Sequence, residues 1–210
     1  METDLLGVVF DGWKKKENPY LLSIIQEYSK TEGQPCADGD ITIWITKPAP
    51  NPIDKLLAIK EASKVEKEAE MEILNHLYAN ANGLTWFHNA CEGWATAPGN
   101  EGKTDTSCVL VGNVLGAPYR RDGFLIGFML VGPHNNYPTH AHAAHEAYHV
   151  IAGEAWLCKN DSGPMHCQAG DVVVHEPYDK HSMVTKESSV LVCWVNSGDT
   201  FGEYYFVLES

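Results

Sequence analysis

Hydrophobic positions follow two different periods along the chain, and the change comes near residue 84. In the first part, apolar residues recur at steps of three and four, the spacing of one face of a helix. From about Thr104, short runs rich in Val, Ile, Phe, Tyr and Trp alternate with clusters of Gly, Pro, Asn and Asp. Such runs are typical of short strands joined by turns. The pattern predicts helices first and a mainly β unit after them.

Two helices are expected in the first part. A short one covers residues 19–30, and a longer one covers residues 51–83, where Asn51 can cap the first turn and Pro52 suits the first helical position. The longer segment ends in an Asn/Gly cluster that stops a helix. Its apolar stripe consists of Ile53, Leu56, Leu57, Val65, Ala69, Ile73 and Leu77.

The second part contains many strand-like runs, which predicts an antiparallel sandwich or barrel. The runs are residues 106–112, 124–132, 146–159, 165–177, 181–196 and 202–209. The chain of 210 residues has no internal repeat and no low-complexity linker. We therefore expect the helical portion, residues 1–84, to pack on the β-barrel of residues 85–210 as one structural unit.

The formal net charge of −13 narrows the classes of partner. Residues 85–210 hold 14 acidic and 6 basic side chains, so this part repels nucleic acid and anionic lipid and mildly favours cationic small molecules. An acidic surface that only keeps the protein solvated would give the same count. We expect neither nucleic acid nor a membrane as partner.

The start of the chain and its cysteines indicate a compartment. The first residues, METDLL, are acidic where a secretory signal is basic, and no apolar run approaches the roughly 18 residues of a membrane span. The six cysteines form no Cys-x-x-Cys pair, and several lie in apolar runs, which favours buried free thiols over disulfides. Both features predict a cytoplasmic protein.

Residues 139–156, THAHAAHEAYHVIAGEAW, concentrate the chemistry and allow two interpretations. As a helix, the stretch places His145 and His149 on one face with Glu146 beside them, the pattern of a zinc protease. Gly153 and the strand-like runs that follow weigh against a helix. We therefore favour a strand, a turn and a second strand.

In the strand interpretation, His140 and His142 point to the same face and can share one ion. A straight strand would hold His142 and Glu146 about 13 Å apart at ~3.3 Å per residue, which is too far for metal bonds of ~2 Å. The chain must therefore turn at residues 143–145. This turn brings Glu146 back beside His142, with Tyr148 on the same face.

A further ligand is expected from a later strand. His181 is the best candidate, because it opens a strand-like run just after a turn that contains Pro177. With this residue included, the spacing resembles the paired metal-binding motifs of the cupin superfamily, whose fold is an antiparallel jelly-roll β-barrel. The matching positions are His140, His142, Glu146 and Gly153, then Gly170, Pro177 and His181. The second motif departs from the family's pattern at Asp179, which stands where glycine is usual.

Within that superfamily, the sequence is most similar to the bacterial dimethylsulfoniopropionate lyases and their lyase-like relatives. Tyr137 lies five residues before His142, Tyr148 ends the His-x-His-x-x-x-Glu-x-Tyr run, and His181 follows His142 by 39 residues. The resemblance implies one divalent transition metal ion (iron, zinc, manganese, cobalt or nickel), with Tyr137 or Tyr148 as the catalytic base. The ligands that it implies are His142, Glu146 and His181, with His140 and Tyr148 on the ion or close to it.

The implied reaction splits a small zwitterion, dimethylsulfoniopropionate, into dimethyl sulfide and acrylate by base-catalysed β-elimination. The metal ion would act as a Lewis acid on the substrate carboxylate. A tyrosine base needs a nearby cation, because the pKa of free tyrosine is about 10. Aromatic faces can hold the sulfonium at ~0.5–2 kcal/mol per ring, although aromatic residues of a barrel more often form its core. The candidate rings are Tyr137, Trp156, Trp194, Phe128 and Tyr204.

Other functions stay open on the sequence alone. A cupin with these ligands can be a dioxygenase, an isomerase, a lyase-like protein with a different substrate, or a binding module without catalysis. Cupins often pair, so a homodimer is one expected assembly. Among the remaining histidines, His145 and His149 are expected at the surface, and His134, His166 and His175 show no ligand spacing.

Overall fold

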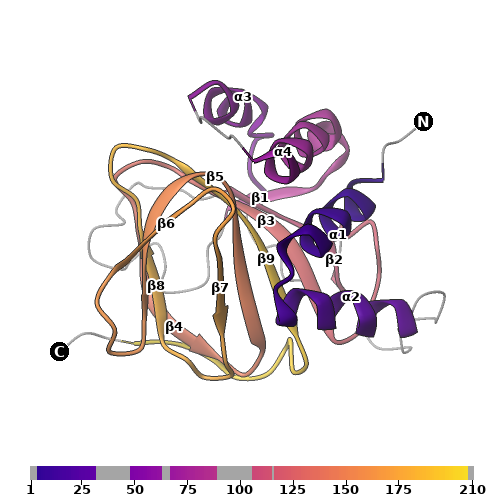
Figure 1. The fold of residues 1–210 in the computed structure, drawn as a ribbon, viewed down its shortest axis with the longest axis vertical. Helices are drawn as coiled ribbons and strands as arrows, with labels where there is room; N and C mark the ends of the chain where they lie inside the picture. The colour runs from indigo at the N-terminus through magenta and orange to yellow at the C-terminus, as the bar shows by residue number, and fades with distance from the viewer. Residues whose placement is uncertain (1–3, 32–47, 63–66, 89–105, 115, 208–210) are drawn as a thin grey trace.

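The fold places the helices first and the strands after them, as the sequence pattern predicts. The structure, a computed structural model, describes residues 4–31, 48–62, 67–88, 106–114 and 116–207. Within these residues, every helix precedes every strand. Figure 1 shows the helices gathered against one side of a curled sheet.

The described helices include one that the sequence pattern did not predict. The elements are α1 (Leu5–Lys16), α2 (Pro19–Thr31), α3 (Ile53–Ala62), α4 (Glu68–Asn80) and the 3₁₀ turn η1 (Ala81–Gly83). α2 confirms the expected short helix, but α1 was missed because Gly7 and Gly12 lower its helix propensity. Asp4 caps α1 by accepting a hydrogen bond from Gly7 N at 3.1 Å. None of the described helices is long and apolar enough to cross a membrane.

The expectation of one helix over residues 51–83 is wrong, because the segment forms α3 and α4. Directly before α4, Lys67 has an extended backbone (φ −88°, ψ 119°), which is not a helical conformation. Of the expected stripe, Leu57 is 37% exposed and Val65 lies outside the described residues. The buried positions of the stripe are Leu56, Ala69, Ile73 and Leu77.

The strands coincide with the predicted runs. They are β1 (Trp86–His88), β2 (Thr106–Val111), β3 (Phe124–Val131), β4 (Asn136–His142), β5 (His145–Lys159), β6 (Met165–Gln168), β7 (Val172–His175), β8 (His181–Val184), β9 (Val190–Ser197) and β10 (Tyr204–Phe206). The runs at 165–177 and 181–196 each divide at a turn into two strands. β4 lies outside these runs but confirms the strand expected at His140 and His142, whereas the short strand β1 was not predicted.

β5 organises the sheet. Its first half pairs with β7 and β9 and its second half with β6 and β8, all antiparallel. The register shifts between Val150 and Ala152, and Gly153 adopts φ +74°, where an added Cβ would clash with the Ser189 carbonyl. Only glycine fits this bend. The sheet, ordered β1-β2-β3-β9-β5-β8-β4-β10, curls into a half-barrel in agreement with the predicted cupin-type fold.

Two hydrophobic cores lie on the two faces of the sheet, because successive side chains of a strand point to opposite faces. The outer core, between the helices and the sheet, includes Trp13, Leu74, Leu110, Phe128 and Ile151. The inner core, inside the barrel, includes Met129, Tyr137, Tyr148, Met183 and Trp194. The helices therefore cover the outer face (Figure 1) and leave the interior of the barrel for a site.

The described cysteines are free thiols, as predicted. They are Cys108, Cys158, Cys167 and Cys193. Burial raises the pKa of the Cys108 thiol to about 12, so this thiol stays protonated and unreactive. Cys36 and Cys91 lie outside the described residues.

Candidate metal centre

The stretch that allowed two interpretations forms a β-hairpin, so the helical interpretation is wrong. β4 ends at His142 and β5 begins at His145, with two turn residues between them. A hydrogen bond from Ala143 N to Glu203 O (2.9 Å) holds the turn against the chain that leads into β10. The predicted reversal brings Glu146 back beside His142, whose Nε2 lies 3.2 Å from Glu146 Oε2.

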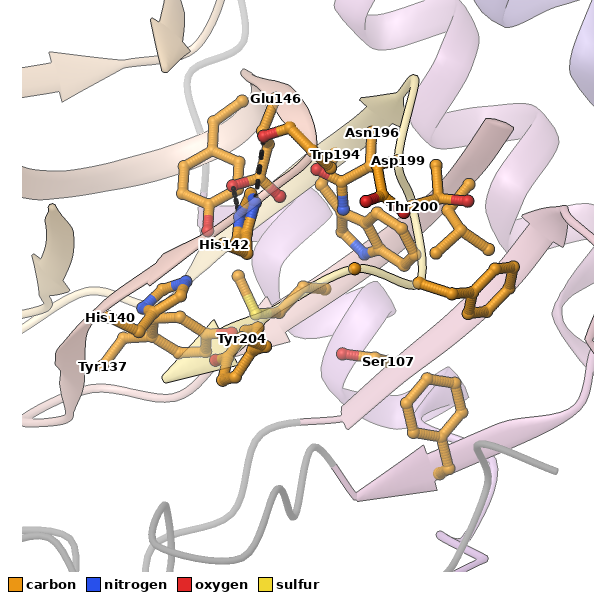
Figure 2. A pocket seen from close by; sticks show the side chains of 17 residues that line it. Ser107, Tyr137, His140, His142, Glu146, Trp194, Asn196, Asp199, Thr200 and Tyr204 are labelled. Atoms are coloured by element: carbon orange, nitrogen blue, oxygen red, sulfur yellow. Dashed lines mark hydrogen bonds and ion pairs between the residues drawn. The ribbon is translucent and has the colours of Figure 1, made fainter. Parts of the chain in front are cut away.

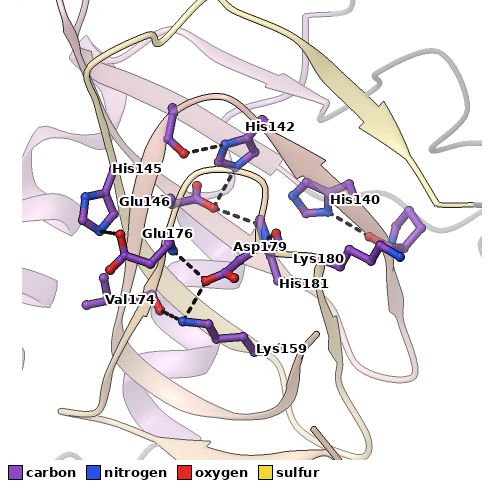
Figure 3. Close-up of polar contacts among 12 residues, drawn as sticks. His140, His142, His145, Glu146, Lys159, Val174, Glu176, Asp179, Lys180 and His181 are labelled. Atoms are coloured by element: carbon purple, nitrogen blue, oxygen red, sulfur yellow. Dashed lines mark hydrogen bonds and ion pairs between the residues drawn. The ribbon is translucent and has the colours of Figure 1, made fainter. Parts of the chain in front are cut away.

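The four residues predicted as metal ligands come together on three strands. His140 on β4 pairs in register with His181, the first residue of β8, and His181 Nε2 lies 3.0 Å from Glu146 Oε2. The ligand atoms that His140, His142, Glu146 and His181 offer all lie within 4.8 Å of one another, and all four residues are buried. Figure 3 shows the three imidazoles grouped around the Glu146 carboxylate.

Backbone carbonyl groups fix the orientation of all three imidazoles. Each ring places Nδ1 next to a carbonyl oxygen two residues away, and a carbonyl can only accept, so Nδ1 carries the proton. The bonds run from His140 to Pro138 (2.9 Å), from His142 to Ala144 (3.1 Å) and from His181 to Asp179 (2.9 Å). Nε2 is therefore the nitrogen of each ring that can bind a metal ion, through its lone pair once it carries no proton.

Asp179 holds the loop that presents His181. Its Oδ2 accepts hydrogen bonds from Glu176 N (2.7 Å) and Lys159 Nζ (2.8 Å). Burial raises the pKa of this carboxyl, but the hydrogen bonds from Lys159 and Asn160 lower it more, to about 2. The residue that departs from the usual glycine of the motif therefore holds its loop as a charged group (Figure 3).

The charges at the centre suit a cation. Burial raises the pKa of Glu146, but hydrogen bonds from His142 and His181 hold it well below the usual range, so the carboxylate is ionised. Burial and the neighbouring His181 hold the pKa of His140 well below 6.5, so that ring is neutral. Without an ion, His142 Nε2 and His181 Nε2 face Glu146 Oε2 at 3.2 and 3.0 Å as hydrogen-bond partners, and a cation bound between them would replace these hydrogen bonds. Three imidazole nitrogens and one carboxylate oxygen suit a divalent transition metal.

Both tyrosines predicted as bases lie inside the barrel beside this centre. Tyr148, two residues after Glu146 on β5, is buried, and its ring centroid lies 5.8 Å from that of His181. Burial, and then the charge of Glu146, raise the pKa of Tyr148 well above 10. With the protein's own groups alone, without a metal ion, the Tyr148 phenol is therefore protonated. Tyr137 on β4 packs edge-on against His140, with ring centroids 5.0 Å apart.

A cavity of about 350 Å³ lies beside the centre. Figure 2 shows polar side chains at its two sides, with His142 and Glu146 on one side and Asn196, Asp199 and Thr200 on the other. Its aromatic lining consists of Phe87, Tyr137, Tyr148, Trp194, Phe201 and Tyr204. No lysine or arginine lines the cavity in the part of the chain that the structure describes.

Two aromatic residues expected at the substrate, Phe128 and Trp156, lie outside this cavity. Along β3, Leu125 faces the cavity, so Phe128, an odd number of residues later, faces the opposite side and is buried under the helices. Trp156 also faces outward from β5, and its ring stacks on His166 with centroids 4.6 Å apart. The aromatic candidates that do line the cavity are Tyr137, Trp194 and Tyr204.

Sequence reasoning missed the loop between β9 and β10, residues 198–203. The cavity residues that it contributes are Asp199, Thr200, Phe201 and Gly202. The Gly and Asp residues mark a loop, but no local pattern indicates that it folds over the mouth of a barrel. Asn196 was missed as well, although it lies two residues after Trp194 and so shares its face of β9.

Two further histidines are buried. The expectation of a surface position for His149 is wrong, because its outward-facing side of β5 is covered by α4, and its Nε2 lies 2.8 Å from Glu70 Oε1. His175 stacks on His181 with ring centroids 4.1 Å apart. Neither ring nitrogen of His175 has a hydrogen-bond partner within the described ranges. His175 supports a ligand ring from behind and is not part of the four-residue cluster.

Comparisons with known proteins agree with this geometry. A sequence model of the dimethylsulfoniopropionate (DMSP) lyase family matches residues 24–192. A chain from the crystal structures of the DMSP lyases RdDddP and RnDddQII has a TM-score of 0.72 and 17% identity, covering 99% of this chain and 97% of that one. The DMSP lyase DddQ from Ruegeria pomeroyi DSS-3 has a TM-score of 0.61 and 20% identity, covering 93% of this chain and 95% of that one. At these identities the two structures show a shared fold. No curated protein matches the chain.

Proposed function

The chain belongs to the DMSP lyase family, and from this premise we propose that it cleaves DMSP to dimethyl sulfide and acrylate by metal-dependent β-elimination. The observation that carries the proposal is the buried cluster of His140, His142, Glu146 and His181 beside a cavity that Tyr148 also lines. This arrangement offers a cation site and a proton acceptor to the same bound molecule.

In this proposal, the cation site binds the carboxylate of the substrate. No lysine or arginine lines the described part of the cavity, so none of the described lining residues offers this anion a lysine or arginine partner. A divalent ion of iron, zinc, manganese, cobalt or nickel, held by the four ligands, would supply Lewis-acid chemistry at the carboxylate and a positive field that lowers the pKa of nearby phenols.

Tyr148 is the base that we propose, because it shares the Glu146 face of β5 and lies beside the cluster. Its phenolate oxygen takes a proton from the carbon next to the substrate carboxylate. The released electron pair forms the carbon-carbon double bond of acrylate, the carbon-sulfur bond breaks, and dimethyl sulfide leaves as a neutral molecule with the bonding pair. Tyr137, on the His140 side of the cavity, is the alternative base.

The far side of the cavity suits the sulfonium end of the substrate. Trp194 lies there beside Asp199 (Figure 2), and its ring can contribute ~0.5–2 kcal/mol of cation–π attraction. Tyr204, by contrast, stacks on the ligand rings of His140 and His142, with centroids 5.3 and 5.9 Å apart. Asp199 is the one carboxylate besides Glu146 among the described lining residues. A zwitterion can therefore span the cavity with its negative end at the cluster and its positive end at Trp194.

The proposed compartment is the cytoplasm. Cys108 and Cys193 lie on strands that flank β3 and are buried free thiols. Such thiols persist where the surroundings are reducing. The zwitterionic small molecule is the proposed partner, and a homodimer is the assembly that we propose for the protein in solution.

The test is a gas-phase sulfide assay on purified, metal-loaded protein supplied with DMSP, combined with elemental analysis. Wild type is expected to release dimethyl sulfide and acrylate in equal amounts. Tyr148→Phe is expected to lower the rate by about 10²–10⁴-fold, the contribution of one general base, with unchanged metal content.

Tyr137→Phe is the matched control, since it removes the other phenol from the same cavity. A loss larger for Tyr137→Phe than for Tyr148→Phe would transfer the role of base to Tyr137. Absence of dimethyl sulfide from metal-loaded wild type would remove the proposed function altogether.

A further inference from the structure

Tyr20 on α2 connects the helical portion to the strand ends beside the metal centre. Its hydroxyl donates a hydrogen bond to the His145 carbonyl oxygen (2.9 Å) and lies 3.0 Å from Ser197 Oγ. Its ring packs on the His145 imidazole with centroids 4.2 Å apart. One helical side chain therefore contacts both the first residue of β5 and the last residue of β9.

The His145 carbonyl belongs to the peptide unit that leads into Glu146. Because a peptide unit is planar, holding its oxygen fixes the direction from which the backbone enters Glu146. In the peptide unit directly before it, the Ala144 carbonyl oxygen accepts the hydrogen bond from His142 Nδ1 (3.1 Å). A rotation of this turn would therefore move one carboxylate and one imidazole of the cluster together.

The contact with Ser197 extends the same support to the mouth of the cavity. Ser197 pairs in register with His145 at the end of the β5–β9 ladder. The loop of residues 198–203, which contributes part of the cavity lining, begins directly after it. Tyr20 therefore contacts both Ser197, the residue before this loop, and His145, the first residue of the strand that carries Glu146.

Tyr20 is itself firmly placed and stays a hydrogen-bond donor. Asn18 Oδ1 accepts hydrogen bonds from Tyr20 N (3.0 Å) and Leu21 N (3.2 Å) at the start of α2. Burial raises the pKa of the Tyr20 hydroxyl above 10, and the charges of Glu146 and Glu176 raise it further. The hydrogen bond with Ser197 lowers this pKa less than burial raises it, so the hydroxyl keeps its proton at neutral pH.

We propose that Tyr20 is a positioning residue of the metal centre, which acts through the His145 peptide to hold Glu146 and His142 in the geometry that binds the ion. The inference rests on the proposed metal-dependent function. Tyr20 and Ser197 both lie outside residues 24–192, the stretch that matches the family model, so the match itself does not assign them this role.

The experiment measures Co²⁺ binding by the full chain, because the visible spectrum of bound Co²⁺ reports the geometry of its ligands and needs no turnover. Tyr20→Phe removes only the hydroxyl and is expected to weaken Co²⁺ affinity about tenfold, at the lower end of the effect of outer-shell partners, and to alter the spectrum. Ser197→Ala is expected to weaken binding less. The double variant is expected to match Tyr20→Phe, because both changes break the same contact.

Ser29→Ala is the matched control, since it removes a hydroxyl of the same helix that donates to the Ile25 carbonyl oxygen within that helix (2.8 Å). Wild-type affinity and spectrum in Tyr20→Phe, even with a lower melting temperature, would overturn the positioning role and leave Tyr20 as a packing residue. Wild type that binds no Co²⁺ would overturn the inference together with the metal site. Wild type that binds Co²⁺ but does not cleave DMSP would remove only the proposed reaction, and the affinity ratio would still decide the role of Tyr20.

Discussion

At the scale of single residues, the metal centre depends on which nitrogen of each imidazole carries the proton. The carbonyl partners at Nδ1 leave Nε2 as the nitrogen of each ring that can bind the ion. Burial lowers the pKa of His142, but the hydrogen bond and charge of Glu146 raise it more, so that it lies above 6.5. Before an ion binds, His142 therefore holds a proton that the ion must displace.

Metal affinity is accordingly expected to rise with pH through the raised pKa of His142. Binding is expected to release a proton at neutral pH, because the protonated fraction of His142 has to ionise before its Nε2 can act as a ligand. Calorimetric titration of Zn²⁺ into the metal-free protein, in buffers of different ionisation enthalpy, measures this proton directly.

Glu146→Gln serves as the comparison for this titration. Without the carboxylate the pKa of His142 falls, so the variant is expected to bind more weakly and to release fewer protons. Equal proton release by both proteins, or affinity independent of pH across the neutral range, would contradict the assigned charge states.

The ligand residues could be predicted from sequence, because strand parity and a short turn leave few ways for His140, His142 and Glu146 to meet. The role of Tyr20 could not be predicted in this way. Its partners, His145 and Ser197, are more than 100 residues away along the chain. No local sequence spacing predicts a contact between a helix and the ends of two strands so far away along the chain.

At the scale of elements, a buried ionic cluster joins the helices to β5. Glu70 on α4 is fully buried and contacts both Lys16 at the end of α1 and His149 on β5. Lys16 Nζ also donates to the Gly170 carbonyl oxygen (3.1 Å) in the turn before β7. These contacts connect two helices and the outer face of the barrel.

Glu70→Ala is expected to lower the free energy of unfolding by about 3–5 kcal/mol, because it leaves Lys16 and His149 without their anionic partner. Glu72→Ala is the matched control on the same helix. The Glu72 side chain is 46% exposed, and its Oε2 lies 3.6 Å from Lys15 Nζ. Removing it is therefore expected to lower the free energy of unfolding by less than about 1 kcal/mol. Urea unfolding of both variants measures the difference, and equal losses would show that the buried cluster contributes little.

The same cluster makes the stability of the fold sensitive to acid. Burial lowers the pKa of His149 below 6.5, so its contribution is present above that pH and declines as the pH falls. The hydrogen bonds from His149 and Lys16 outweigh burial and lower the pKa of Glu70 from 4.5 to about 2. Its contribution is complete above pH 4.5 and is lost towards pH 2, and this acid-dependent part should be absent from Glu70→Ala.

Element types were easier to predict than their ends. Runs of β-branched and aromatic residues located β2, β3, β5 and β9, because both faces of these strands are largely buried and their apolar runs are continuous. The division between α3 and α4 was not predictable, since the helical period and the Lys/Glu-rich sequence continue through the extended Lys67. Helical propensity is only a weak constraint, so it could not locate this break.

At the scale of the whole molecule, the fold assigns its two faces to different tasks. The outer face of the sheet is buried under α1 to α4, whereas the inner face holds the four-residue cluster and the cavity. Period analysis predicted both parts of the chain, but it could not show that the outward face of β5 is covered. For this reason His149 was predicted to be exposed, although it is buried between the helices and the sheet.

We expect the cluster to make the stability of the molecule depend on metal as well. Its ligands lie on β4, β5 and β8, so one ion would connect three strands. In the sheet, β8 lies between the other two. An ion that binds only the folded state stabilises it by about 2.7 kcal/mol at a free concentration 100 times its Kd. For a chain of this size that gain corresponds to a rise in melting temperature of roughly 5–10 °C.

Thermal unfolding with and without Zn²⁺, followed by circular dichroism in the far ultraviolet, measures this rise. A chelator is expected to reverse it without changing the strand spectrum at room temperature, because none of the four ligand residues belongs to either hydrophobic core. His142→Ala should abolish the rise, whereas His166→Ala, which removes an exposed imidazole from the outer face of the barrel, should retain it. A rise that survives in His142→Ala would place the stabilising ion elsewhere on the protein.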